Sequence, residues 1–308
     1  MKIIPVKLKN NPYNIHIGRN CLSRISLYAQ KNNLGNLGIV IVPHSVYQLY
    51  KKYINSTFRP KSTYKIIKVK DGESLKSRYW LFKVIKQILE YDKLNKRIFL
   101  ICLGGGTVGD LGGFIASIYK RGIPYIQAPT TLLAQIDSSI GGKTAIDLKE
   151  AKNIVGSIYQ PKAVFTDPSF LSTLPAKEFN QGMAEAIKYG IIKDRKLFAF
   201  LKNRGEEIKK KRKSSLLELI ATCSAIKAVI VSTDEKEERG IRTILNFGHT
   251  FAHALESAQK YKNISHGEAV SIGMVFAAFL SCNLGKCRKK IIGDICEVLK
   301  IYGLPTGI

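Results

Sequence analysis

Short runs of β-branched and other apolar residues, separated by polar breaks, occupy the first half of the chain. Such runs predict strands, and the one at 38–42 is continuous enough for a strand buried on both faces of a parallel sheet. Residues 75–91 carry apolar positions at helical spacing. Strand, helix and strand in this order form the βαβ pattern of a nucleotide-binding sheet. The predicted strands are 3–8, 13–17, 38–42, 64–69, 97–103 and a run that begins at Tyr125.

From about Leu171 the pattern changes to long amphipathic segments. Apolar residues recur there every three or four positions, which is the period of a helix. We therefore predict two domains, an α/β domain over residues 1–170 and an all-α domain over residues 171–308. The predicted helices are 179–192, 197–211, 216–231, 242–258, 266–283 and 288–301.

Composition favours a folded globular protein. Of the 308 residues, 45% are hydrophobic and 23% are charged, which argues against disorder. The net charge of +26 fits either a nucleic-acid partner or an anionic small substrate. Basic residues are spread along the chain without the interleaved aromatic residues that stack bases, so we expect no nucleic-acid partner.

Cysteine usage and the N-terminus indicate a reducing compartment. The six cysteines are scattered without Cys-x-x-Cys spacing, so reduced thiols are expected. The first residues carry no apolar run of signal-peptide length, and no segment reaches 18 uninterrupted apolar residues. We therefore expect a cytoplasmic protein without membrane association.

A glycine-rich stretch, residues 104–113, follows the predicted strand 97–103 and leads into an apolar helix. Glycines at this place let backbone N–H groups approach a pyrophosphate at the helix N-terminus. The match to G-x-G-x-x-G is loose, and a tight turn into a closely packed helix is the alternative. The segment 142–144, Gly-Lys-Thr, is similar to the end of a P-loop, but the upstream glycine frame is missing and we reject that motif.

Three of the five histidines lie within the 18 residues 249–266. His249 and His253 are four apart in a run with helical spacing, so both imidazoles should project from one helix face. Imidazoles and a carboxylate form the ligand set of a catalytic Zn²⁺, and a helix with two hydrogen-bonded histidines is the alternative. Glu185, with apolar neighbours and Lys188 three residues on, is the best carboxylate to complete the site. For that pair, a helix-surface ion pair is the alternative.

Together these segments resemble the 3-dehydroquinate synthase family of sugar-phosphate cyclases. The resemblance runs from about Asp71 to about Pro305. It implies a dehydroquinate synthase-like fold, in which a Rossmann-like α/β domain binds NAD and an all-α domain binds Zn²⁺ or Co²⁺. It also implies a small anionic sugar-phosphate substrate in the cleft between the domains. The segments that carry it are 104–110, 120–122, 129–143, 182–190, 245–253 and 266–268.

The resemblance implies roles for individual residues. The metal ligands are Glu185, His249 and His266. The NAD contacts are Asp71, Gly72, Glu73, Ser74, Leu75, Lys76, Gly105, Gly106, Thr107, Val108, Gly109, Asp110, Thr130, Thr131, Lys143, Lys152, Phe170, Leu171, Ser172 and Thr173. The substrate and catalytic positions are Arg121, Asp137, Asn153, Lys188, Lys227, Glu238, Arg242, Asn246 and His253.

The family converts 3-deoxy-D-arabino-heptulosonate 7-phosphate to 3-dehydroquinate and phosphate in the shikimate pathway. Transient oxidation of a ring hydroxyl by NAD makes the adjacent C–H acidic, which allows β-elimination of phosphate before re-reduction and aldol cyclisation. The metal polarises the oxidised hydroxyl, and His253 relays its proton. Three alternatives remain: another sugar-phosphate cyclase, a metal-dependent polyol dehydrogenase, and a basic binding protein without catalysis. A homodimer is expected.

Three features depart from the family pattern. His44 stands where the family has Asp or Asn against the adenosine ribose, which predicts weaker ribose recognition. The acidic loop 234–242 is one residue longer than usual, so the substrate-binding glutamate is Glu237 or Glu238. Family members continue past the position of Ile308 and supply a further lysine to the substrate site. The chain is then a fragment or a naturally short relative, and we expect turnover to be reduced roughly tenfold or more.

Overall fold

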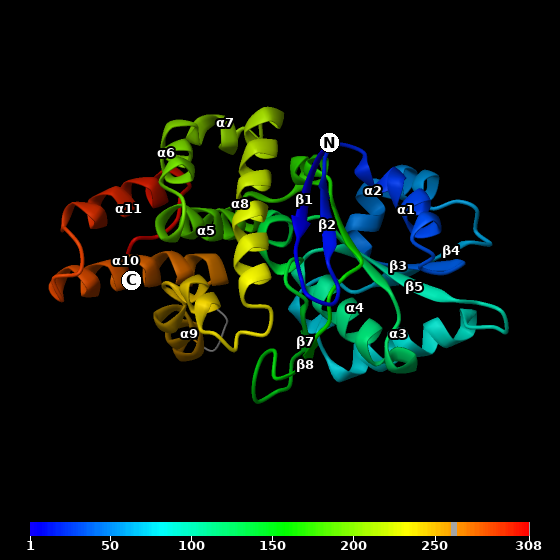
Figure 1. Cartoon of the computed structure of the whole chain (residues 1–308). Helices are drawn as coiled ribbons and strands as arrows, with labels where there is room; N and C mark the ends of the chain where they lie inside the picture. Colours follow the sequence, from blue (N-terminus) through cyan, green and yellow to red (C-terminus); the bar gives the residue numbers. More distant parts are fainter. Residues whose placement is uncertain (260–263, 308) are drawn as a thin grey trace. The chain divides into compact units, whose positions relative to one another are not determined.

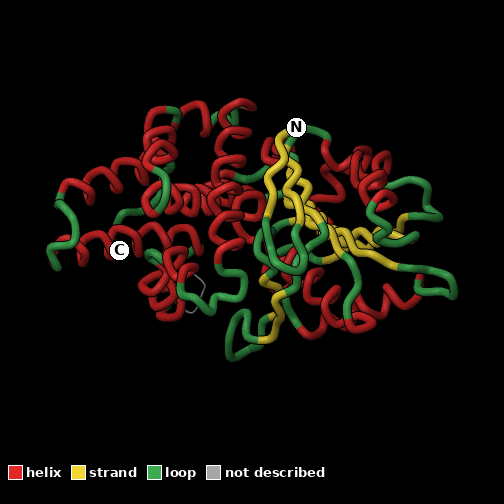
Figure 2. The backbone as a smooth tube through the Cα atoms, viewed as in Figure 1, coloured by secondary structure: helices red, strands yellow, loops and turns green. Residues whose placement is uncertain are grey.

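The computed structural model describes residues 1–259 and 264–307. The chain divides into two compact units, Met1–Phe170 and Leu171–Ile308. All described strands belong to the first unit, and the described part of the second is built from helices (Figures 1 and 2). The predicted fold class, an α/β domain followed by an all-α domain, is therefore confirmed.

A seven-stranded sheet forms the centre of the first unit, with strand order β1-β2-β9-β6-β5-β3-β4. Its strand pairs are parallel except for β1 with β2. A separate antiparallel pair, β7 with β8, was not predicted from the sequence. The bounds are β1 (Lys2–Val6), β2 (Tyr13–Ile17), β3 (Leu37–Pro43), β4 (Tyr64–Val69), β5 (Ile98–Gly104), β6 (Tyr125–Pro129), β7 (Lys143–Ile146), β8 (Val155–Ile158) and β9 (Ala163–Thr166).

Helices cover both faces of this sheet (Figure 1). In β3, Ile39 and Ile41 pack toward α3 and α4, whereas Val40 and Val42 pack toward α1 and α2. All seven residues of β3 are buried, as the continuous apolar run at 38–42 predicts. The helix bounds are α1 (Ile25–Lys31), α2 (His44–Thr57), α3 (Arg78–Tyr91) and α4 (Gly106–Ile118).

The second unit is helical, and two predicted helices are interrupted. The prediction of one helix over 242–258 is wrong because Gly248 has φ +80°, which separates a 3₁₀ turn at Ile241–Asn246 from α9. The prediction of one helix over 197–211 is wrong because Arg204, at φ −109° and ψ 19°, separates α6 from α7. The bounds are α5 (Ala176–Ile192), α6 (Arg195–Asn203), α7 (Gly205–Lys209), α8 (Lys213–Thr233), α9 (His249–Ala258), α10 (His266–Asn283) and α11 (Lys290–Ile301).

Helix α8 is the one described helix that is long and apolar enough to cross a membrane, judged by length and composition. Its mean hydropathy reaches 1.7 over 18 residues, but 56% of that window is buried inside the protein. Ile220, Cys223 and Val231 are among the buried side chains. A core helix has the same composition, so α8 is weak grounds for a membrane span.

Candidate active site

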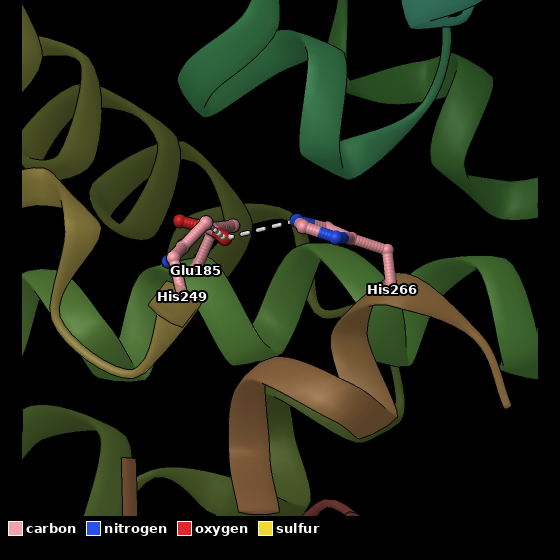
Figure 3. A group of neighbouring side chains, drawn as sticks. All are labelled: Glu185, His249 and His266. Carbon is pink, nitrogen blue, oxygen red and sulfur yellow. Dashed lines mark ion pairs between the residues drawn. The ribbon is translucent and has the colours of Figure 1, made fainter. Parts of the chain in front are cut away.

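Three helices of the second unit bring a carboxylate and two imidazoles together. Glu185 lies on α5, and His249 and His266 are the first residues of α9 and α10. Glu185 Oε1 is 3.4 Å from His249 Nε2 and 3.7 Å from His266 Nε2. One ligand atom from each residue lies within 4.8 Å of the others, and Figure 3 shows both rings directed toward the carboxylate. A convergent N,N,O donor set of this kind fits a divalent metal such as Zn²⁺.

Glycines permit the close helix crossings that assemble this group. A Cβ atom on Gly273 would lie 2.0 Å from the carbonyl oxygen of Gly248, which immediately precedes His249. A Cβ atom on Gly267 would lie 2.5 Å from the Cα atom of Gln181 on α5. Any larger residue would force α10 away from α9 or α5. Each close crossing is therefore adjacent in sequence to one of the two histidines.

A capping box fixes His266 in the first turn of α10. Ser265 accepts a hydrogen bond from the backbone N–H of Glu268, and the Glu268 carboxylate accepts one from the Ser265 N–H at 2.8 Å. The carboxylate of Glu268 therefore serves in capping the N-terminus of α10, where it accepts hydrogen bonds from the N–H and the hydroxyl of Ser265. The segment Ser-His-Gly-Glu thus encodes a helix start, a candidate metal ligand and a close helix crossing in four residues.

The opposite nitrogen of each ring also has a partner. His249 Nδ1 is 3.3 Å from the carbonyl oxygen of Phe247, and His266 Nδ1 is 3.4 Å from Glu256 Oε1. When each Nδ1 carries the proton, both Nε2 lone pairs face Glu185 and are free to bind a metal. Glu256 was not predicted from the sequence, although its position seven residues after His249 places it two turns along the same helix.

Glu185 and His266 have shifted pKa values because each contacts groups of opposite charge. Burial would raise the pKa of this carboxyl group, but contact with the Lys188 ammonium and the two imidazoles holds it well below its usual range. Burial lowers the pKa of His266, but Glu185 and Glu256 outweigh that effect and raise the pKa to about 9. A metal that binds His266 must therefore displace a proton at neutral pH.

His253 lies beside the metal-ligand candidates without joining them. Its ring centroid is 5.6 Å from that of His249 and 6.5 Å from that of His266. Partial burial and the neighbouring His249 lower the pKa of His253, which favours the neutral ring. Its side chain is exposed. A neutral, accessible imidazole is able to accept a proton from a bound alcohol.

One of the two glutamates left open by the sequence, Glu237, contacts a second candidate, Arg242. Glu237 Oε1 lies 3.1 Å from Nε of the buried Arg242, whose Nη1 donates to the carbonyl oxygen of Glu235 at 2.8 Å. Glu237 is therefore the residue that orients Arg242. Glu237 and Glu238 are both exposed in this loop, so the identity of the substrate-binding glutamate stays a prediction. The other candidates of this unit lie on α5 (Lys188), on α8 (Lys227) and at the end of the 3₁₀ turn (Asn246).

In the first unit, the glycine-rich stretch forms the junction of β5 and α4. Gly105 precedes α4 and no side chain caps this helix, so its first N–H groups are available to an anion. A Cβ atom on Gly105 would lie 3.1 Å from the Thr131 side chain, and one on Gly106 would lie 3.0 Å from Ser138 Oγ. A larger residue at either position would therefore have to displace the neighbouring side chain.

Lys76 contacts three other residues that were predicted to bind cofactor or substrate. Its buried ammonium lies 2.9 Å from Asp110 and 3.5 Å from Glu73, and it contacts the amide oxygen of Asn153. Asp147, which was not predicted, lies 3.8 Å away. Burial lowers the pKa of Lys76, but the carboxylates outweigh it and the net shift is upward. Burial raises the pKa of Asp110 to about 6 even beside this lysine.

The remaining candidates of the first unit lie in connections between its elements. His44 is the exposed first residue of α2, and Asp71 accepts a hydrogen bond from the next residue, Ser45. Arg121 is exposed, with a left-handed φ of +63°. The others are Thr130 and Thr131 after β6, Asp137 in the π-helical turn Ala134–Ser138, Lys143 at the start of β7, Lys152 between β7 and β8, and Phe170 to Thr173 in the 3₁₀ turn Pro168–Thr173.

Comparison with known proteins identifies the family. Residues 66–181 match the family described as 3-dehydroquinate synthase N-terminal, and residues 182–308 match 3-dehydroquinate synthase C-terminal. The chain belongs to the 3-dehydroquinate synthase family. A member from Thermodesulfovibrio yellowstonii, named 3-dehydroquinate synthase, is 43% identical over 310 residues, which cover 100% of this chain and 86% of that protein.

Solved structures of related cyclases share the fold. The 2-epi-5-epi-valiolone synthase of Streptomyces hygroscopicus subsp. jinggangensis, with NAD⁺ and Zn²⁺ bound, has a TM-score of 0.86 at 25% identity; the match covers 97% of this chain and 82% of that one. A 2-deoxy-scyllo-inosose synthase complexed with carbaglucose-6-phosphate, NAD⁺ and Co²⁺ has a TM-score of 0.82 at 25% identity, covering 98% and 81%. The chain is thus similar to enzymes of one cyclase superfamily.

Proposed function

We propose that this protein converts 3-deoxy-D-arabino-heptulosonate 7-phosphate to 3-dehydroquinate and phosphate, as an NAD- and metal-dependent carbon–oxygen lyase. The observation that carries the proposal is the 43% identity, over the whole chain, to a relative named 3-dehydroquinate synthase. The convergent carboxylate and imidazoles of the second unit support it. We extend the proposal to a homodimeric assembly, which light scattering of the purified protein tests.

The metal would be held by Glu185, His249 and His266. These residues fit a catalytic Zn²⁺ or Co²⁺ because they supply three ligands and leave further coordination positions for substrate. When bound, the ion supplies Lewis-acid polarisation of the hydroxyl that is oxidised. The chain itself contributes the orientation of both rings, through the Nδ1 contacts of the two histidines.

NAD would be held by the first unit. The uncapped start of α4 fits its pyrophosphate, and Lys76, Glu73 and Asp110 are the charged groups next to that turn. When bound, the dinucleotide supplies the reversible oxidation that makes the substrate C–H acidic. The left-handed Arg121 and the exposed Lys152 are assigned to the phosphate of the substrate, and Asp137 and Asn153 to its hydroxyl groups.

Within the second unit, His253 is assigned to accept the proton of the alcohol that is oxidised. Its lowered pKa favours the neutral imidazole, which is the form able to act as a base. Arg242 and Lys227 are buried cations, which suits recognition of a carboxylate or phosphate. Arg242 is held in place by Glu237. Lys188 is assigned to keep Glu185 ionised for the metal.

A related cyclase activity is the second candidate, because the two cyclase structures share the fold at 25% identity. The higher identity to the 3-dehydroquinate synthase relative favours the first. The deciding experiment incubates the purified protein with heptulosonate phosphate, NAD⁺ and Zn²⁺ and measures phosphate release and 3-dehydroquinate. Release is expected in the wild type and not in His249→Ala. Wild-type protein that releases phosphate only from another sugar phosphate would exclude the first candidate.

A further inference from the structure

We infer that Glu256 is a positioning residue for the metal site, acting through His266. The inference rests on the proposed metal centre and adds a residue to it. Glu256 lies on α9 and is 7% exposed. Its Oε1 is 3.4 Å from His266 Nδ1, the ring nitrogen opposite to the one that faces Glu185. The imidazole of His266 thus lies between two carboxylates, one on the metal side and one behind the ring.

A carboxylate behind a metal-binding imidazole has two effects. It accepts the Nδ1–H, which fixes the tautomer whose Nε2 lone pair is free, and it holds the ring against rotation about the Cβ–Cγ bond. It also makes the imidazole a stronger electron donor. His266 needs this support more than His249, because its side chain is 33% exposed compared with 14% for His249.

The two histidines are supported differently. His249 Nδ1 faces a neutral carbonyl oxygen, that of Phe247, which is two residues away and moves with the same helix start. His266 begins α10, and its Nδ1 partner comes from a different helix, α9. Glu256 therefore ties α10 to α9 across the site, and α9 supplies both one ligand and the support of the other. Loss of Glu256 should loosen His266 while His249 stays in place.

The test compares Glu256→Ala and Glu256→Gln with wild type and with a matched control, Glu206→Gln. Glu206 is an exposed glutamate of the same unit, paired with Lys209 at 2.9 Å. Affinity for Zn²⁺ is measured by chelator competition on folded protein, and the visible absorption of the Co²⁺ form reports ligand geometry. Glu256→Ala should bind Zn²⁺ about 10- to 100-fold more weakly and give an altered Co²⁺ spectrum.

Glu256→Gln keeps the shape and an amide oxygen that can accept the Nδ1–H, so its affinity should lie between those of wild type and Glu256→Ala. If Glu256→Ala does not fold, the glutamine variant carries the test alone. Unchanged affinity and an unchanged Co²⁺ spectrum in the folded variants would overturn the inference and leave the proposed function intact. A wild-type protein that binds no metal would overturn the proposed metal centre, and the inference with it.

Discussion

Lys188 and Glu185 form a buried ion pair on adjacent turns of α5, and their side chains are 3% and 2% exposed. The same carboxylate faces both imidazoles, so the ammonium balances its charge when no metal is present. Replacing Lys188 by Met leaves a buried carboxylate with less compensation. We expect the free energy of unfolding of the metal-free protein at pH 7 to fall by about 3–5 kcal/mol, measured by urea denaturation.

Lys202→Met is the control for that prediction. Lys202 pairs with Glu297 at 2.6 Å, but these side chains are 38% and 54% exposed, so water replaces the lost partner. Its effect on the unfolding midpoint should be small. Equal effects of the two substitutions would show that burial of the Glu185–Lys188 pair has no bearing on stability.

The close crossing of α9 and α10 gives a second prediction. A methyl group on Gly273 would lie 2.0 Å from the carbonyl oxygen of Gly248, so Gly273→Ala must push the helices apart. We expect a loss of about 1–3 kcal/mol of stability. Because His249 starts α9, Zn²⁺ affinity measured by chelator competition should fall by roughly tenfold or more.

Gly293→Ala on α11 separates this effect from the general consequences of replacing a glycine. No atom lies within 4 Å of the Cβ position at Gly293, so alanine there is expected to be neutral or to stabilise the helix by up to about 1 kcal/mol. Zinc affinity should be unchanged. Wild-type affinity in Gly273→Ala would mean that the crossing does not determine the position of His249.

Sequence patterns predicted the elements with strong local signals. The bounds of β2, β4 and α10 agree with the predictions 13–17, 64–69 and 266–283. Helix α10 has the clearest start signal, since Ser265 and Glu268 form a capping box around His266. The approach of Glu185 to two histidines was predicted from their chemistry together with the family resemblance, and the metal-binding role of these residues stays a prediction.

Other features depend on contacts that spacing along the chain does not encode. Helix α2 was not predicted: Ile54 is its one buried residue, and the tyrosines that pack against the core beside it are only partly buried. Asp147 directly follows β7, and it is brought next to Lys76, which is far away in the sequence, only when the chain folds. Glu256 belongs to no motif in the sequence, and its contact with His266 arises from the packing of α9 on α10.

Asp110 and Asp92 should affect the pH dependence of stability in opposite directions. Burial raises the pKa of Asp110 from 3.8 to about 6, so near pH 5 the folded protein holds a proton that the unfolded chain has lost. The contribution of Asp110 to stability therefore increases as pH falls from 7 to 4, and is lost as pH rises through 6. Relative to Asp110→Asn, the wild type should gain about 2 kcal/mol over that range, measured by urea denaturation without NAD.

Asp92 is the matched acid of the same unit with the opposite shift. Burial would raise its pKa, but hydrogen bonds from Lys120 and Tyr119 lower it below 3.8. Its contribution is therefore present above the unfolded pKa and is lost as pH falls through the folded value. The advantage of wild type over Asp92→Asn should shrink between pH 5 and pH 3, whereas its advantage over Asp110→Asn grows from pH 7 to pH 4. Parallel pH profiles for the two variants would show that burial does not govern the titration of Asp110.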